Sequence, residues 1–283
     1  MNTIQEDLRT TVGVAGTLLI PKVIYGTMIE EVQKTLIPRE LAALYLGPAQ
    51  IPGIDIRINL ESENFMDVRV IGEGAEIWQD QDSYTSILLE PVKYGVRVNI
   101  TREMIEDSQF PMLQLNLRKA AKRFAEKETE LIITALDSAA NTVSGGAAIT
   151  IANITRAIQY LEDSDYTGTD ILVGNEVVND LRNIDTFVEA DKLGSREMLT
   201  RGMVGIIYGL RVYRFSTNAA PSTTYAKYAY VIDRSQAYGI AEKRTLTMEN
   251  YKIETQDTEG VAFTWRFDVE LLRTSAVAKI TTS

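Results

Sequence analysis

The hydrophobic pattern changes period along the chain, and long stretches of it alternate between apolar and polar positions. In residues 92–100 one face carries Val92, Tyr94, Val96, Val98 and Ile100, and the other carries Lys93, Arg97 and Asn99. A period of two predicts a β-strand with one covered face. Residues 245–253 and 261–272 alternate in the same way on either side of a charged segment at 254–260, which predicts an extended β-hairpin.

A helical period replaces the alternation between residues 111 and 139. Apolar residues recur there at steps of three or four, and Glu128 is the one polar residue on their face. These apolar residues are Leu113, Leu117, Ala120, Phe124, Leu131 and Ala135. At 1.5 Å per residue the predicted helix is a rod of roughly 40 Å, which suits a rigid strut.

A compact α/β region is predicted after a glycine-rich break at 144–147. Its predicted elements are a helix at 153–162, a buried strand at 170–173, a helix at 176–184, a loop at 185–194 and strands at 206–215 and 228–233. The chain closes with a strand at 276–281. Alternating helices and strands of this kind indicate a layer of helices on a sheet.

The N-terminal third predicts an extended arm, then a pair of strands at 54–60 and 67–71 joined by a polar turn, and then a projecting loop. Ile77 and Trp78 lie in that loop beside an acidic, amide-rich tip at 79–82, far from any predicted core. Such residues pack either on their own subunit or on another chain. The length and polarity of the loop favour the second interpretation.

Composition narrows the classes of function. The chain has 283 residues, of which 45% are hydrophobic and 24% charged, so it can form one large or two modest domains with a real core. A net charge of -10 argues against a protein that grips nucleic-acid phosphates. The opening residues do not form a secretory signal, and no apolar stretch is long enough for a bilayer. We therefore expect a soluble cytoplasmic product without membrane contact.

Enzymatic and metal motifs are incomplete. The chain has neither Cys nor His, which removes disulfides, structural zinc, thiol chemistry and imidazole bases. Gly72 and Gly74 lack a third glycine at the dinucleotide spacing because Ile77 stands there, and the glycines at 144–147 precede no Lys-Ser/Thr pair. We therefore predict no enzyme, no cofactor and no metal site.

Five short stretches, taken in order, resemble one family. They are VIGEGAEI (70–77), VRVNITREMIEDS (96–108), ILVGNEVVNDLRN (171–183), YVIDRSQAYGIAEKRTLTM (230–248) and LLRTSAVAKI (271–280). Together with the order of predicted elements they resemble the Hong Kong 97-type major capsid proteins of tailed double-stranded DNA viruses. Each stretch alone is a weak signal, whereas their shared order covers most of the chain from about residue 15.

The resemblance implies an α+β capsid fold with six segments. These are an N-terminal arm (1–25), the start of a peripheral domain (26–53), an extended β E-loop (54–95), the peripheral domain with a long spine helix (96–143), an α/β axial domain (144–240), and a return to the peripheral domain with a long hairpin and the C-terminal strand (241–283).

The resemblance also implies a function, namely self-assembly into pentamers and hexamers of an icosahedral shell that encloses double-stranded DNA without sequence-specific binding. In that family the E-loop lies across a neighbouring subunit, which would bury Ile77, Trp78, Tyr84 and Ile87 between chains. The axial loop, with Asp185, Glu189, Asp191 and Lys192, would line the ring axis. The hairpin tip, with Arg244, Gln256, Asp257 and Glu259, would lie near three-fold positions.

Two departures from the family pattern affect the expected chemistry. The type member joins its subunits by a lysine–asparagine isopeptide bond assisted by a glutamate, but those positions are Ile77, Asp257 and Thr264 here, and the nearby Lys93 is on a strand. We therefore expect a non-covalent shell, with a cementing protein as one possible partner. Met1 lies only some 17 residues before Leu18-Leu19-Ile20-Pro21; if Met1 is the translated start, scaffolding would come from a separate protein or not be needed.

Two other classes remain open at the level of the sequence. An encapsulin-type compartment holding a cargo protein would need the same strut, loop and axial domain, although the long arm and E-loop favour a viral shell assembled in the host cytoplasm with a portal protein. A lone binding module would instead be a monomer.

Overall fold

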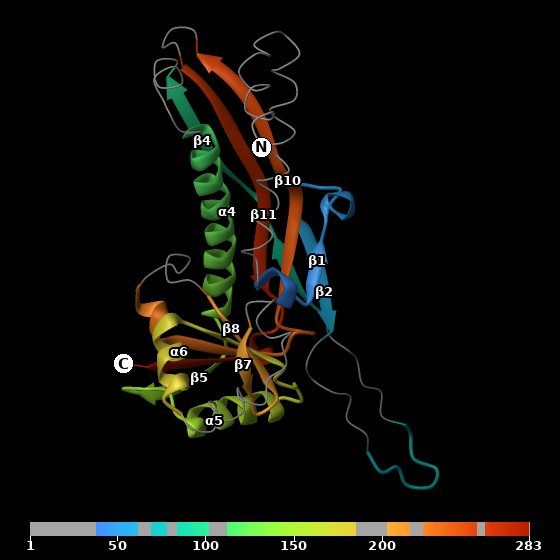
Figure 1. Ribbon diagram of the computed structural model, residues 1–283. Coiled ribbons are helices and arrows are strands. Elements are labelled where there is room, and N and C mark those ends of the chain that lie inside the picture. Colours follow the sequence, from blue (N-terminus) through green and yellow to red (C-terminus); the bar gives the residue numbers. More distant parts are fainter. Residues whose placement is uncertain are drawn as a thin grey trace, which may run out of the picture.

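The computed structural model describes residues 38–61, 69–77, 84–101, 112–184, 203–215, 223–253 and 258–282. Within these residues the chain forms two main sheets and a two-stranded ribbon. Figure 1 shows an elongated sheet beside one long helix, a second sheet with two shorter helices at the other end, and a loop that projects away from both. Among the described helices, none is long and apolar enough to cross a membrane.

The elongated sheet has the order β1-β10-β11-β4. Strands β10 (Tyr238–Ile253) and β11 (Thr258–Leu271) form the predicted antiparallel hairpin, and β10 begins earlier than its alternation indicated. Strand β4 (Val92–Thr101) pairs antiparallel with β11, and the short β1 (Leu44–Leu46) pairs parallel with β10. Two 3-10 turns, η1 (Pro38–Leu41) and η2 (Pro48–Gln50), flank β1.

Helix α4 (Met112–Leu136) covers one face of this sheet, and the predicted strut is therefore present. Every second residue of β11 is buried against it, and the rings of Phe124 and Trp265 meet edge to face with centroids 6.2 Å apart. The face of β4 is only partly covered, contrary to the sequence prediction. Tyr94 packs on the helix, but Val92 remains 54% exposed, because β4 is an edge strand with no neighbour on its outer side.

The second sheet has six strands in the order β5-β12-β9-β6-β8-β7. Its strands are β5 (Asn141–Gly146), β6 (Asp170–Val173), β7 (Met203–Ile207), β8 (Leu210–Arg214), β9 (Tyr228–Ile232) and β12 (Val277–Thr282). Helices α5 (Ile151–Glu162) and α6 (Asn175–Arg182) pack their apolar faces on it. Two further 3-10 turns, η5 (Thr223–Lys227) and η7 (Thr274–Ala276), lead into β9 and β12.

Three sequence predictions for this sheet need correction. The single strand expected at 206–215 is two strands, because Tyr208 and Gly209 adopt positive φ angles of 47° and 82° and turn the chain. The break expected at 144–147 lies largely in β5, which pairs parallel with β12. The closing strand, assigned to the peripheral segment 241–283, lies in the six-stranded sheet, because Ala278 and Ile280 fill the core beneath α5.

The ribbon consists of β2 (Ile56–Glu61) and β3 (Tyr84–Leu89), which pair antiparallel. The predicted partner of the first strand, at 67–71, is wrong: the described residues 69–77 contain no strand. The base of the ribbon is anchored in a small core in which Leu89 and Ile51 pack against Ala241 of β10. Residues 69–77, here called the projecting loop, lie away from both sheets (Figure 1).

Candidate assembly interfaces

Large apolar side chains are exposed along the ribbon and the projecting loop. Of the four residues predicted to lie between subunits, Ile77 is 77% exposed and Tyr84 67% exposed. Ile87 is only partly exposed and lies opposite Ile58 in the ribbon, while Trp78 lies outside the described residues. The sequence analysis missed Ile54, Val70, Ile71 and Leu88, which are also exposed. Ile54, Val70 and Ile71 were missed because the sequence analysis placed them in the predicted strands at 54–60 and 67–71, which were expected to be covered.

The predicted hairpin-tip group is not one site. Arg244 lies opposite Arg266, whereas the last pair of the hairpin joins Ile253 to Thr258. Nine residues separate Arg244 from that end of β10, which is roughly 30 Å of extended strand. The prediction that Arg244 lies at the tip is therefore wrong, because Arg244 lies within β10, nine residues before the strand ends at Ile253.

The remaining predicted positions are only partly described. Gln256 and Asp257 lie outside the described residues, as do Asp185, Glu189, Asp191 and Lys192 of the axial loop. Glu259 is on β11 opposite Lys252. Thr264, at the family's glutamate position, is paired with Gly95 and Thr247, and its hydroxyl lies 2.8 Å from that of Thr247.

A polar cluster is buried where helix α4 meets the elongated sheet. The carboxylate of Glu242 on β10 accepts hydrogen bonds from Trp265 Nε1 at 2.7 Å, from the Tyr45 hydroxyl and from the Arg39 guanidinium. Arg39 Nε also lies 3.5 Å from Glu128 Oε1 of α4. The cluster thus joins η1, β1, the strut and the hairpin, just before the ribbon begins.

The charge balance of this cluster is unusual, since two carboxylates share one guanidinium. Glu128 is fully buried and neither of its oxygens accepts a hydrogen bond from the described residues. Burial raises the pKa of Glu128 to about 7, Arg39 opposes that rise, and the charge of Glu242 adds to it. Burial and the hydrogen bond to Glu242 also raise the pKa of Tyr45. Glu128 therefore takes up a proton close to neutral pH.

A second polar cluster ties the C-terminal end of α4 to the six-stranded sheet. Asp137, just after α4, forms an ion pair with Lys279 of β12 and accepts hydrogen bonds from Tyr230 at 3.2 Å and Tyr225 at 3.3 Å. Burial raises the pKa of Tyr230, and the nearby Asp137 raises it further. In the described part of the chain, no group of acidic residues could hold a metal ion.

Comparison with known proteins identifies a family. A family model described as "Phage capsid protein" matches residues 84–280, which is more than half of the chain. No curated relative matches the sequence.

Solved structures share the fold at low sequence identity. A Microbacterium phage Oxtober96 structure has a TM-score of 0.61 and 16% identity and covers 85% of this chain and 90% of its own. The capsid of a native GTA particle has a TM-score of 0.66 and 15% identity, with coverages of 88% and 90%. The bacteriophage PhiM1 mature capsid has a TM-score of 0.62 and 13% identity, with 85% of both chains covered.

These matches decide among the classes that the sequence left open. The matched proteins are structural proteins of capsids and not enzymes, and an encapsulin-type compartment is not favoured. The fold is the Hong Kong 97-type fold expected from the ordered motifs. The chain belongs to the phage capsid protein family, as a major capsid protein that self-assembles into the shell of the virion.

Proposed function

We propose that the chain forms five- and six-membered rings of an icosahedral shell around double-stranded DNA, and that the E-loop of one copy covers part of the adjacent copy without a covalent bond. The observation that carries this proposal is the exposure of Val70 and Ile77 on the projecting loop and of Tyr84 on the ribbon, whose base is anchored in the small core around Leu89. Burying each such side chain contributes about 1.5–3 kcal/mol. Because the same contact is repeated at every copy in a closed shell, the summed stabilising free energy is large.

The non-covalent part of the proposal rests on the residues at the family's cross-linking positions. Ile77 has no amine, and Thr264 has no carboxylate that could act as a base. Lys93 is exposed but lies on β4, within a sheet. Apolar contacts and charge pairs would therefore hold the subunits together.

The wider assembly follows from the same proposal. The axial loop at 185–192 would line the ring axis, and the hairpin tip around 256–259 would lie near three-fold positions. Assembly would take place in the host cytoplasm, with separate scaffolding, portal and cementing proteins as partners. A net charge of -10 suits a shell that encloses DNA without binding it in a sequence-specific way.

The test is the double variant Ile77→Ser, Tyr84→Ser, expressed with the neighbouring genes. Both side chains are exposed in the subunit, so we expect a folded subunit by circular dichroism but few or no shells by electron microscopy. The control is Tyr208→Asn, which removes another exposed aromatic at a positive φ angle that Asn tolerates. Normal shell yield from the double variant would contradict the proposal.

A further inference from the structure

Three cations form one row across the elongated sheet, on the face away from α4. Arg244 of β10 lies directly opposite Arg266 of β11, and Arg266 lies directly opposite Lys93 of β4. Neighbouring strands are about 4.8 Å apart, and like charges directly opposite one another are destabilising. The row therefore carries a cost in the isolated subunit.

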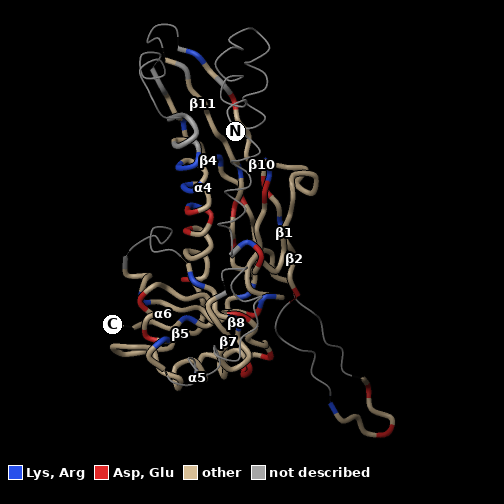
Figure 2. Tube along the Cα trace, in the orientation of Figure 1, with Lys and Arg blue, Asp and Glu red and all other residues tan. Residues whose placement is uncertain are grey.

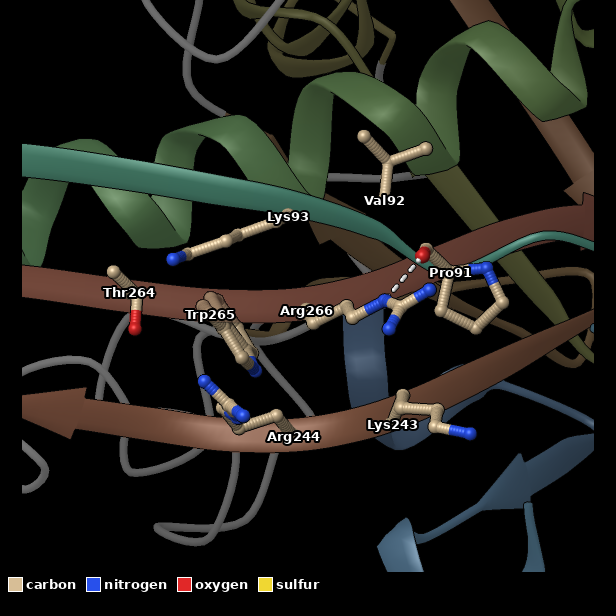
Figure 3. A pocket seen from close by; sticks show the side chains of 8 residues that line it. All are labelled: Pro91, Val92, Lys93, Lys243, Arg244, Thr264, Trp265 and Arg266. Carbon is tan, nitrogen blue, oxygen red and sulfur yellow. Dashed lines mark hydrogen bonds between the residues drawn. The ribbon is translucent and has the colours of Figure 1, made fainter. Parts of the chain in front are cut away.

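The row borders a hollow of about 510 Å³, shown in Figure 3. Its lining consists of Pro91, Val92, Lys93, Lys243, Arg244, Thr264, Trp265 and Arg266. Lys243 and Arg244 are adjacent in sequence, yet both line it. Register shifts on either side of Arg244 account for this, because a bulge re-aims side chains that would otherwise alternate between faces.

Contacts within the subunit leave part of this positive charge unbalanced. Arg266 donates its Nε hydrogen to the Pro91 carbonyl at 2.7 Å, and Lys243 donates to the carbonyl oxygens of Ile51 and Gly53. These partners are neutral. Lys93 and Arg244 have no ion pair in the described part of the chain, and no described carboxylate lines the hollow. A chain with more acidic than basic residues has thus gathered four cations at one place.

The projecting loop has the complementary charge. Its residues 69–77 contain Glu73 and Glu76 and one cation, Arg69, and Asp80 and Asp82 follow in the sequence. Glu73 and Glu76 are exposed, and Figure 2 shows acidic positions, in red, on the described part of the projecting loop. Ile77 beside them is also exposed.

We propose that the hollow is the surface that receives the projecting loop of a second copy, with Glu73 and Glu76 placed on the row formed by Lys93, Arg244 and Arg266. This inference rests on the proposed E-loop contact and names its receiving surface. Complementary charges at an interface set register and speed association, and their effect weakens with salt. The row thus gives assembly an electrostatic recognition step in addition to apolar burial.

The test is charge exchange. The double variant Lys93→Glu, Arg244→Glu changes two exposed side chains and should slow shell formation by roughly tenfold at low ionic strength, with a smaller effect in high salt. Adding Glu73→Lys and Glu76→Lys to the same chain should restore assembly. The matched control is Arg118→Glu, Lys119→Glu, which makes the same charge change on exposed positions of α4. Light scattering and electron microscopy measure the rate and yield of shells.

Three outcomes would overturn the inference. Unchanged assembly of Lys93→Glu, Arg244→Glu, together with failure of the Ile77→Ser, Tyr84→Ser variant, would leave the E-loop contact standing and place its receptor elsewhere. If Lys93→Glu, Arg244→Glu assembled normally but bound a short DNA duplex more weakly than the parent, the cation row would instead be a phosphate-binding site. Slowed assembly of Lys93→Glu, Arg244→Glu that is not restored by adding Glu73→Lys and Glu76→Lys would also contradict the proposal.

Discussion

The ribbon and the six-stranded sheet use the same kinds of side chain in opposite ways. Ile171 of β6 is fully buried, and α5 and α6 complete the core around that sheet. Ile77 on the projecting loop is 77% exposed. An apolar residue that its own chain covers stabilises the subunit, whereas one left exposed can contribute only when another copy covers it. The six-stranded sheet therefore stabilises the subunit, whereas the exposed residues of the projecting loop remain available for the contact between copies that we propose.

The largest expected contrast comes from truncating one side chain in each region. Leu161→Ala on α5 removes a fully buried side chain and should lower the free energy of unfolding of the unassembled subunit by about 2–5 kcal/mol. Ile77→Ala should change it by less than about 0.5 kcal/mol, because little contact is lost. Urea denaturation of both variants measures the difference. Similar losses would mean that the loop is covered by its own subunit.

The next largest effect is a pH dependence of subunit stability that arises from Glu128. Glu128 belongs to the polar cluster that joins helix α4 to the long hairpin. Its folded pKa of about 7 lies above its ordinary value of 4.5, so the folded state keeps a proton that the unfolded state releases between these values. The contribution of Glu128 to the free energy of unfolding is therefore largest below about pH 4.5 and falls as the pH rises to about 7. The shift corresponds to a loss on the order of 3 kcal/mol.

The variant Glu128→Gln isolates this effect because its side chain does not titrate. We expect the difference in free energy of unfolding between pH 5 and pH 8 to be smaller in this variant than in the parent. Glu130→Gln on the same helix is the control, since Glu130 is partly exposed and pairs with Lys127. Equal pH dependence of the parent and Glu128→Gln would show that Glu128 stays ionised throughout.

A glycine-to-alanine substitution in each region tests the same difference between the six-stranded sheet and the projecting loop. A Cβ on Gly174, before α6, would lie 2.3 Å from the Ala226 carbonyl oxygen, so Gly174→Ala should lower the free energy of unfolding by about 1–3 kcal/mol. A Cβ on Gly72 in the projecting loop meets nothing within 4 Å. Gly72→Ala should therefore leave the unfolding midpoint nearly unchanged in thermal denaturation of the subunit. A large loss from Gly72→Ala would indicate hidden packing of the loop.

Sequence patterns located most elements but not their partners. Strand β6 was predicted at its observed bounds, and the strut and the long hairpin were recognised from their periods. The pairing of β2 with β3, and the place of β12 between β5 and β9, were not predicted. A period depends on residues a few positions apart, whereas strand pairing depends on contacts between distant segments.

Some of the candidate interface residues could be predicted from the sequence, and others could not. Ile77 could be predicted as an exposed contact residue, because an apolar residue beside an acidic segment is visible in the sequence. The cation row could not be chosen, because its three members come from three strands and a bulge brings Arg244 into register. Likewise, Glu128 was visible as a polar residue on an apolar helix face, but its partner Arg39 lies on a different element.

By itself the amino-acid sequence determined the element types, the acidic charge, the absence of thiol and imidazole chemistry and, through ordered motifs, the capsid family. These properties depend on composition and on neighbours along the chain. Only the tertiary structure decided that the closing strand completes the distant sheet, that two buried carboxylates share one guanidinium, and that three cations lie side by side. These depend on segments tens to hundreds of residues apart, which meet only when the chain folds.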